Sequence, residues 1–332
     1  MSKQNNSIND KTILITGGTG SFGKKCTESL LKNYNPLKLI IFSRDELKQF
    51  EMKQMFSDYT DQLRFFIGDV RDKDRLYRAF DGVDVVIHAA ALKQVPSCEY
   101  NPIEAVKTNV IGAVNIIDAA IDQNVNRVIA LSTDKAANPI NLYGATKLCS
   151  DKLFVQGNAY TGRKRTRFSV VRYGNVIGSR GSVIPIFMKN KKHGFLPITD
   201  KKMTRFWITL EQGVNFVVDS LNNMQGGEIF VPKISSMSVT DLAKAICPKC
   251  KLKVVGKRPG EKVHETMISK EDAMHTIEFD NYYIIKPGFI LLETNYEIKG
   301  KPVSEDFEYN SNTNSMMLTS EDLLEMIQDD IN

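Results

Sequence analysis

The segment TILITGGTGSFGKK, residues 12–25, constrains the fold of this chain more than any other part of its sequence. A short apolar run is followed by Gly17, Gly20 and Gly23 and then by residues suited to a helix. Glycines at such a turn let the backbone approach a pyrophosphate, which then lies at the helix N-terminus. A glycine triplet alone is weak evidence, but its strand–turn–helix context predicts a dinucleotide-binding site.

The first half of the chain alternates short apolar runs with amphipathic stretches, a pattern typical of βαβ units. From about residue 175 onward, Gly and Pro separate shorter elements, as expected of a smaller lobe. We therefore predict an α/β fold with a doubly wound parallel sheet of the Rossmann type in residues 1–174. Residues 175–332 are predicted to form a smaller C-terminal substrate-binding lobe, with some interleaving of the chain. The expected strands are 12–16, 38–42, 64–68, 84–90, 127–132 and 168–174, and the clearest helices are 103–123 and 143–160.

Composition excludes several classes of protein. With 332 residues, 42% of them hydrophobic and 25% charged, the chain can bury a full core without disulfides. No apolar run approaches the roughly 18 residues of a membrane helix, and the polar N-terminus does not resemble a secretory signal. We expect a cytoplasmic protein without membrane partners. The basic runs at 163–167 and 189–193 lack interleaved aromatic residues, so we expect no nucleic-acid partner either.

Cysteine and charge patterns give two further expectations. The five cysteines are odd in number and scattered, which is not typical of a disulfide framework. Cys247 and Cys250 form a CxxC pair, but tetrahedral zinc needs four ligands, so we expect no metal and two incidental thiols. The last thirty residues hold eight acidic residues and no Lys or Arg and are predicted to end in an acidic helix. The remaining chain is basic, which suits a phosphate-bearing ligand or a solvated surface.

The end of the second expected strand indicates which dinucleotide is bound. An NAD enzyme usually presents a carboxylate there to the ribose hydroxyls, but Ser43 and Arg44 come first in this sequence. Lys48 lies one helical turn beyond, so two cations can hold a 2′-phosphate, and NADP is favoured. Asp45 keeps an alternative open: if its carboxylate faces the ribose instead of Arg44, the cofactor is NAD.

The segment after the fifth expected strand contains a first acid/base pair, Tyr143 and Lys147. Spaced i and i+4 on a helix, they share a face, so the ammonium can lie near the phenol. A free tyrosine titrates near 10, and half-ionisation at pH 7 needs a shift of about three units, which a nearby cation favours. We expect Tyr143 to take a hydroxyl proton while hydride leaves the same carbon.

The same segment contains a second pair, Asp134 and Lys135, which alcohol oxidation alone does not need. If the oxidised carbon is carbon 4 of a hexose, the new ketone acidifies the proton on carbon 5. Lys135 as base and Asp134 as acid could then eliminate water across carbons 5 and 6. The alternative is a solvated salt bridge at a strand end.

The segments GGTGSFG, YGATK and STDKAANP together resemble the extended short-chain dehydrogenase/reductase superfamily. Within it they are similar to the inverting UDP-N-acetylglucosamine 4,6-dehydratases that open pseudaminic acid biosynthesis for flagellin glycosylation. The resemblance covers essentially the whole chain and implies NADP, a UDP-N-acetylglucosamine substrate and a homo-oligomer, often a hexamer. It also implies a UDP-2-acetamido-2,6-dideoxy-β-L-arabino-hex-4-ulose product. Related dTDP-glucose dehydratases carry Asp-Glu at the positions of Asp134 and Lys135, which leaves the stereochemistry at carbon 5 open.

The resemblance also implies roles for individual residues. Beside the glycines of the turn, the cofactor would be lined by Thr19, Gly20, Ser21, Phe22, Ser43, Arg44, Asp45, Lys48, Asp69, Val70, Ala89, Tyr143 and Lys147. The UDP-sugar would be surrounded by Lys93, Asn175, Arg180, Thr199, Arg205, Arg258 and Glu261. Two other functions stay open: a UDP-hexosamine 4-epimerase, which needs no Asp-Lys pair, and a catalytically silent NADP-binding sensor or scaffold.

Overall fold

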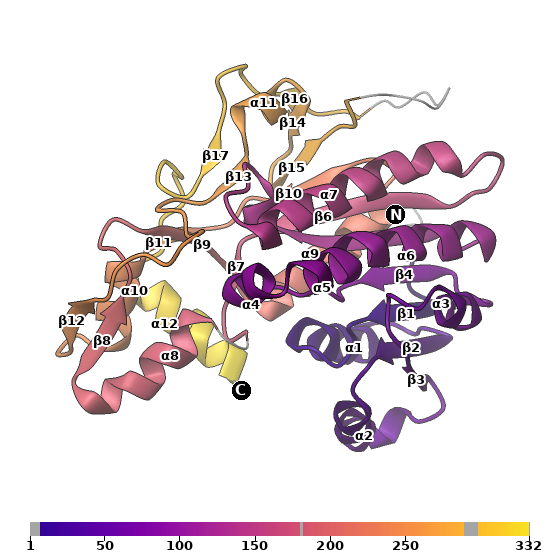
Figure 1. Ribbon diagram of the computed structural model, residues 1–332, viewed down its shortest axis with the longest axis horizontal. Coiled ribbons are helices and arrows are strands. Elements are labelled where there is room, and N and C mark those ends of the chain that lie inside the picture. Colours follow the sequence, from indigo (N-terminus) through magenta and orange to yellow (C-terminus); the bar gives the residue numbers. More distant parts are fainter. Residues whose placement is uncertain (1–6, 180–181, 289–297, 332) are drawn as a thin grey trace.

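A computed structural model describes residues 7–179, 182–288 and 298–331 of the protein (Figure 1). Within these residues a ten-stranded sheet forms the centre of the fold, with strand order β16-β14-β15-β10-β6-β5-β4-β1-β2-β3. Seven neighbouring strands, from β10 to β3, are parallel, and the other three are antiparallel. The parallel strands are β1 Thr12–Thr16, β2 Lys38–Ser43, β3 Leu63–Ile67, β4 Val85–His88, β5 Arg127–Thr133, β6 Arg167–Tyr173 and β10 Ile229–Pro232. The antiparallel strands are β14 Thr276–Glu278, β15 Tyr282–Ile285 and β16 Lys301–Pro302.

The six strands expected from the sequence are confirmed, with ends that differ by at most two residues. These strands could be predicted because their apolar residues are consecutive and buried. In β1, for example, Ile13, Leu14 and Ile15 are all fully buried. Parallel strands covered by helices on both faces read as continuous apolar runs rather than as alternating ones. The predicted doubly wound parallel sheet is therefore confirmed.

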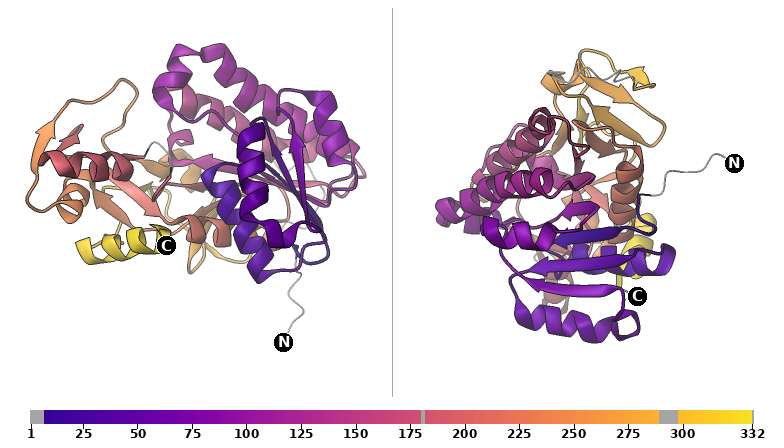
Figure 2. Two further views of the ribbon diagram at one scale, coloured as in Figure 1. Left: turned by 90° about the horizontal axis from the view of Figure 1, so that it is seen from below. Right: turned by 90° about the vertical axis from the view of Figure 1, so that its right-hand side faces the viewer.

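Helices cover both faces of this sheet (Figure 2). On one face α3 packs on α6, and α6 packs on α7; on the other face α1 packs on α9. The helices are α1 Ser21–Asn33, α2 Glu46–Met55, α3 Lys73–Phe80, α4 Val95–Tyr100, α5 Pro102–Val106, α6 Gly112–Asp122, α7 Leu142–Gly157 and α9 Leu210–Asn223. The expected helix 103–123 is present with one irregularity, a π-helical turn (η2) at Lys107–Ile111 between α5 and α6. The expected helix 143–160 is α7 with a final 3-10 turn (η4) at Asn158–Tyr160.

A smaller lobe lies beside the carboxyl ends of the parallel strands (Figure 1). Its own core contains Trp207, Phe187, Leu242 and Leu323. The apolar residue Leu323 belongs to the acidic C-terminal helix, which packs against α10. The lobe consists of β7 Asn175–Val176, α8 Val183–Asn190, β8 Phe195–Ile198, β9 Thr204–Ile208, β11 Ser236–Ser238, α10 Val239–Ile246, β12 Lys251–Val254 and α12 Ser320–Ile331. Three short elements, β13 Thr266–Ile268, α11 Lys270–Ala273 and β17 Tyr309–Asn310, are nearer the main sheet, whose core includes Met267, Ile268 and Tyr309.

The division into two domains at residue 174 stays a prediction. The chain passes between the main sheet and the smaller lobe more than once. Strand β7 begins the lobe at Asn175, yet α9, β10, β14, β15 and β16 return to the main sheet. No helix in the described part of the chain is long and apolar enough to cross a membrane.

The expectation of two incidental thiols is wrong, because Cys247 and Cys250 form a disulfide. Cys247 ends helix α10, and a tight turn follows in which the Cys250 N–H donates to the Cys247 carbonyl at 3.1 Å. This turn brings the two Cα atoms to 5.3 Å, a separation that a disulfide requires. The other cysteines, Cys26, Cys98 and Cys149, are free.

Candidate active site

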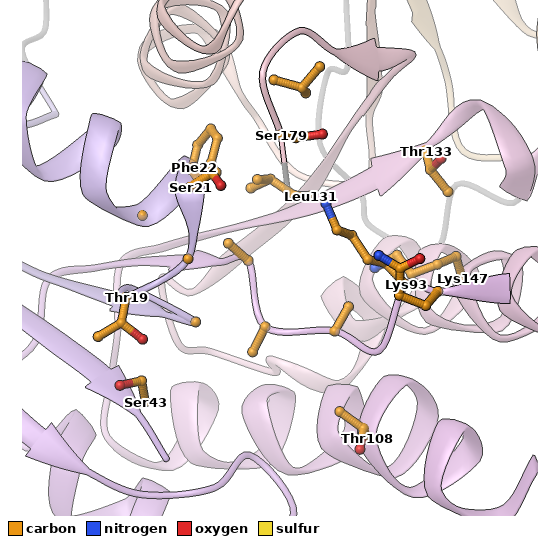
Figure 3. A pocket seen from close by; sticks show the side chains of 18 of the residues that line it. Thr19, Ser21, Phe22, Ser43, Lys93, Thr108, Leu131, Thr133, Lys147 and Ser179 are labelled. Carbon is orange, nitrogen blue, oxygen red and sulfur yellow. The ribbon is translucent and has the colours of Figure 1, made fainter. Parts of the chain in front are cut away.

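A cavity of about 950 Å³ lies at the carboxyl ends of the parallel strands. Such a volume is typical of a site for a cofactor and a small substrate. Figure 3 shows Thr19 and Ser43 at one end of the cavity and Thr133, Lys93 and Lys147 at the other. All the predicted cofactor residues line it: Gly17, Thr19, Gly20, Ser21, Phe22, Gly23, Ser43, Arg44, Asp45, Lys48, Asp69, Val70, Ala89, Tyr143 and Lys147.

The glycine turn between β1 and α1 forms a cradle that side chains would fill. Gly17 has a φ of +65°, and a Cβ there would lie 2.9 Å from the Ala90 backbone. A Cβ at Gly23 would lie 2.3 Å from the Gly18 carbonyl oxygen. Helix α1 begins at Ser21, and its N-cap Gly20 has no side chain to bind the first N–H groups. Free N–H donors at a helix N-terminus bind anions, so these residues fit a dinucleotide pyrophosphate.

Arg44 and Asp45, the two candidate ligands for the cofactor ribose, follow β2 and have different surroundings. The Asp45 carboxylate caps α2, accepting from the Lys48 N–H at 3.0 Å, and its other oxygen lies 2.5 Å from Lys48 Nζ. Hydrogen bonds from Lys48 lower the pKa of Asp45. Arg44 is exposed at the cavity, where its Nη1 lies 3.6 Å from Asp69 Oδ2. Both residues line the cavity, where Lys48 engages the Asp45 carboxylate at short distance and the Arg44 guanidinium has a looser pairing with Asp69.

Helix α7 positions Tyr143 and Lys147 in the cavity wall. Its N-cap is Asn141, whose side-chain oxygen accepts from the Gly144 N–H at 2.7 Å. Burial raises the pKa of Tyr143 to about 12, although the Lys135 cation and a hydrogen bond with Thr133 act in the opposite direction. Burial also lowers the pKa of Lys147, against the attraction of Asp151. The expected fall in the pKa of Tyr143 is thus wrong for the protein alone, because burial of the phenolate outweighs the nearby cations.

Thr133 lines the cavity and was missed in the sequence. It is the last residue of β5, and its hydroxyl donates to Asp134 Oδ1 at 2.9 Å besides contacting Tyr143. Its position at the end of a strand, directly before Asp134 and Lys135, could have identified it as a site residue from the sequence. The other lining residues with polar side chains that were missed in the sequence are Gln94, Thr108, Ser132, Tyr173, Ser179 and Ser182.

Asp134 and Lys135 lie in the 3-10 turn η3, Asp134–Ala136, which follows β5. Asp134 is fully buried, whereas Lys135 lines the cavity. The Lys135 Nζ lies 2.9 Å from Asp134 Oδ1 and 3.5 Å from Oε1 of Glu265, a residue absent from the sequence prediction. Burial opposes the Lys135 charge, but the two carboxylates outweigh this effect and raise the pKa of Lys135. The pair is therefore a partly buried ion pair in the cavity wall and not a solvated salt bridge.

The residues predicted to surround the substrate are only partly brought together. Lys93 and Asn175 line the cavity, while Arg180 lies outside the described residues. The described residues that line the cavity do not include the other four, which are Thr199, Arg205, Arg258 and Glu261.

Arg205, predicted to contact the substrate, is engaged within the protein. Its guanidinium is buried and donates to the backbone carbonyls of Thr204, Val263 and Lys262. Those donors are used within the protein, so Arg205 does not face the cavity as a clamp for a diphosphate. Arg258, by contrast, is exposed, and its Nε lies 3.8 Å from Glu261 Oε1.

A doubly wound sheet with a glycine turn after β1 and a tyrosine–lysine pair on α7 defines a dinucleotide-binding protein of the short-chain dehydrogenase/reductase class. The model of the polysaccharide biosynthesis protein family matches residues 13–287. The chain belongs to this family, and its predicted place in the extended short-chain dehydrogenase/reductase superfamily, among enzymes related to the inverting dehydratases, is confirmed.

Individual relatives cover nearly the whole chain. An inverting UDP-N-acetylglucosamine 4,6-dehydratase of Campylobacter jejuni is 56% identical over 96% of this chain and 98% of its own. A UDP-glucose 4-epimerase of Rickettsia canadensis is 42% identical over 96% of this chain and 95% of its own. The solved structure of Pen from Bacillus thuringiensis has a TM-score of 0.88 at 35% identity, covering 97% of this chain and 99% of that one.

Proposed function

We propose that the protein dehydrates UDP-N-acetylglucosamine across carbons 5 and 6, with oxidation at carbon 4 and inversion at carbon 5. The product is UDP-2-acetamido-2,6-dideoxy-β-L-arabino-hex-4-ulose. The observation that carries this proposal is the buried Asp134–Lys135 pair in the wall of the cavity that Tyr143 and Lys147 also line. The printed name of the Campylobacter jejuni relative supports the same reaction.

We assign NADP as the cofactor. Ser43, Arg44 and Asp45 all line the cavity at the start of α2, but the Asp45 carboxylate is engaged by Lys48 and its own helix. A guanidinium binds a phosphate with two parallel hydrogen bonds, which suits a 2′-phosphate at this position. When bound, the dinucleotide would supply reversible hydride transfer, from carbon 4 and back to carbon 6, with a proton added at carbon 5 from the solvent.

Tyr143 is the base for the alcohol oxidation and takes the proton of the 4-hydroxyl. Because burial raises its pKa to about 12, the phenolate needs donors and cations close by. Thr133 supplies a hydrogen bond, and Lys135 and Lys147 line the same cavity. These groups stabilise the phenolate at the moment when the hydroxyl proton is transferred.

Lys135 and Asp134 perform the elimination. The Lys135 ammonium first passes a proton to Asp134, whose Oδ2 has no hydrogen-bond partner in the described structure. Neutral Lys135 then removes the proton from carbon 5, and the proton held by Asp134 leaves with the 6-hydroxyl as water, relayed through Lys135. The relay is required because Asp134 is fully buried and only Lys135 of the pair lines the cavity.

The biological setting rests on the resemblance alone. We propose that the reaction is the first step of pseudaminic acid biosynthesis for flagellin glycosylation. We also propose that the enzyme works in the cytoplasm as a homo-oligomer, and a monomeric mass in solution would contradict the second part of this proposal. Light scattering of the purified protein distinguishes a hexamer from a dimer.

The test is proton NMR of the purified protein with UDP-N-acetylglucosamine in D₂O, without added reductant. We expect a new methyl signal, deuterium at carbon 5 and an L-configured keto sugar. A product that retains the D configuration contradicts the inversion. Bound NADP with no turnover of any nucleotide sugar favours a non-catalytic scaffold instead.

A UDP-hexosamine 4-epimerase is the second candidate, because the Rickettsia canadensis relative carries the name UDP-glucose 4-epimerase. Epimerisation uses the same tyrosine and cofactor but needs no base at carbon 5. A Lys135→Ala variant should therefore keep an epimerase activity and lose a dehydratase activity. Formation of only the 4-epimer by the wild-type protein would establish this alternative.

A further inference from the structure

Glu265 is a buried carboxylate directly behind Lys135. It precedes β13 and is 2% exposed. Its Oε1 lies 3.5 Å from Lys135 Nζ and 3.7 Å from Arg205 Nε, and its Oε2 has no hydrogen-bond partner among the residues that the structure describes. A buried carboxylate with so few partners costs stability, so its presence beside the proposed base needs an explanation.

The backbone around Glu265 holds it firmly in this position. The Glu265 N–H donates to Ser311 Oγ at 2.9 Å, and the Ser311 N–H donates to the Glu265 carbonyl at 2.8 Å. The Ser311 hydroxyl is in turn 2.7 Å from Thr204 Oγ1 on β9. Three segments far apart in the sequence therefore fix the direction from which the carboxylate faces Lys135.

The charges around the cluster come from several elements. Asp134 and Glu265 are its carboxylates, and Arg205 and Lys262 are cations that stabilise Glu265. Lys135 is also faced by Tyr143 from α7 and by Lys93 from the segment after β4. Burial raises the pKa of Glu265, and the Lys135 ammonium lowers it, so each group favours the charged form of the other.

We propose that Glu265 is a positioning residue for the dehydration step, which rests on the proposed function: it stabilises the Lys135 ammonium while Asp134 is protonated. At the start Lys135 is an ammonium and both carboxylates are ionised. One proton moves from Lys135 to Asp134, and Lys135 then takes the proton of carbon 5. At this point Glu265 is the carboxylate that pairs with the Lys135 ammonium. Once the 6-hydroxyl has left as water with the proton stored on Asp134, the cluster has regained its starting charges.

The test compares Glu265→Gln with the wild-type protein in two half-reactions. Formation of reduced nicotinamide reports oxidation at carbon 4, and formation of the methyl product reports dehydration. We expect dehydration to fall at least about tenfold, while oxidation changes by less than about twofold. Reduced nicotinamide should therefore accumulate during turnover. A Glu265→Gln variant that dehydrates at the wild-type rate overturns the proposal, and so does an equal loss of both half-reactions.

A pH profile and a matched control separate this role from general support of the fold. Glu265 must be ionised to pair with Lys135, so its protonation should contribute to the acidic limb of kcat in the wild type, and in Glu265→Gln this limb should move to lower pH. An unmoved limb contradicts the proposal. Glu228→Gln is the control, because Glu228 is equally buried but bonds Ser169 and the backbone of Gly226. It should change thermal stability without changing the ratio of the two half-reactions.

A second variant covers the case in which Glu265→Gln does not fold. Glu265→Asp keeps the charge but withdraws the carboxylate from Lys135 by one methylene, so dehydration should still fall by at least about threefold. Wild-type dehydration by Glu265→Asp overturns the proposal. Wild-type turnover is measured first. A wild-type protein that forms no methyl product refutes the proposed function, whereas an active wild type with unaffected Glu265 variants refutes only the role of Glu265.

Discussion

The ammonium nitrogen of Lys135 lies 2.9 Å from Oδ1 of Asp134, yet only Lys135 lines the cavity, because Asp134 is fully buried. This arrangement places a single group of the pair where a substrate can touch it. The other group serves as a neighbour that accepts or supplies a proton.

Lys135→Arg should keep the buried ion pair and lose dehydration. An arginine retains its charge at every accessible pH and cannot serve as a base, so the product should form at least about 100-fold more slowly. Oxidation at carbon 4 should continue, which absorbance of the reduced nicotinamide would show. Lys152→Arg, at an exposed position of α7, is the control. Dehydration by Lys135→Arg at a rate close to the wild type would exclude Lys135 as the base.

Arg44→Ala should weaken NADP binding by about tenfold to 100-fold, since one charge-assisted contact to a phosphate is lost. Binding of NAD should hardly change, because NAD lacks the 2′-phosphate. Titration of nicotinamide dinucleotides against protein fluorescence measures both affinities. Arg71→Ala is a matched control, because Arg71 also pairs with Asp69 but is not among the described residues that line the cavity. A wild-type preference for NAD would instead support the Asp45 alternative.

Gly23→Ala should destabilise the protein by about 1–3 kcal/mol, because the new methyl group cannot be accommodated without moving α1 from the glycine turn. The added Cβ would lie 2.3 Å from a backbone oxygen, which has little freedom to move. Cofactor affinity should fall as well. Urea unfolding measures the first effect and a cofactor titration the second.

Gly213→Ala provides the contrast within the same protein. Gly213 lies inside α9, and an added Cβ would meet no described atom within 4 Å beyond its own helix. Replacing glycine by alanine in a helix should stabilise the protein by about 0.5–1 kcal/mol. Equal effects of the two substitutions would contradict the steric argument for Gly23.

His88 should make stability depend on pH below neutrality. Its ring is buried, with Nδ1 2.7 Å from Thr16 Oγ1, and burial together with the Lys147 cation lowers its pKa to about 3. The unfolded chain takes up a proton near pH 6.5, whereas the folded protein does not, so the contribution of His88 is present above pH 6.5 and is lost as the pH falls towards 3.

The measurement is the free energy of unfolding at pH 7 and at pH 5. Between these values the wild-type protein should lose about 2 kcal/mol more than His88→Gln. His193→Gln, at an exposed turn, should lose as much as the wild type. If the His88→Gln difference is absent, the imidazole is protonated in the folded protein and the buried neutral ring is excluded.

The sequence predicted the dinucleotide end of the site better than the substrate end. Gly17, Gly20 and Gly23, and also Tyr143 and Lys147, belong to short segments whose spacing fixes their geometry. All of these residues line the cavity. Thr199, Arg205 and Arg258 lie in the lobe, where no local spacing decides which way a side chain points, and none of them is among the described lining residues.

By itself the sequence determined the parallel sheet, the glycine turn and the common face of Tyr143 and Lys147, because apolar periodicity and helical spacing act over a few residues. Only the tertiary structure decided what surrounds those groups. It buried Tyr143 deeply enough to raise its pKa, tied Arg205 to backbone carbonyls and brought Glu265 to within 3.5 Å of Lys135. Burial and charge pairing depend on segments that meet only when the chain is folded, so no local pattern could specify them.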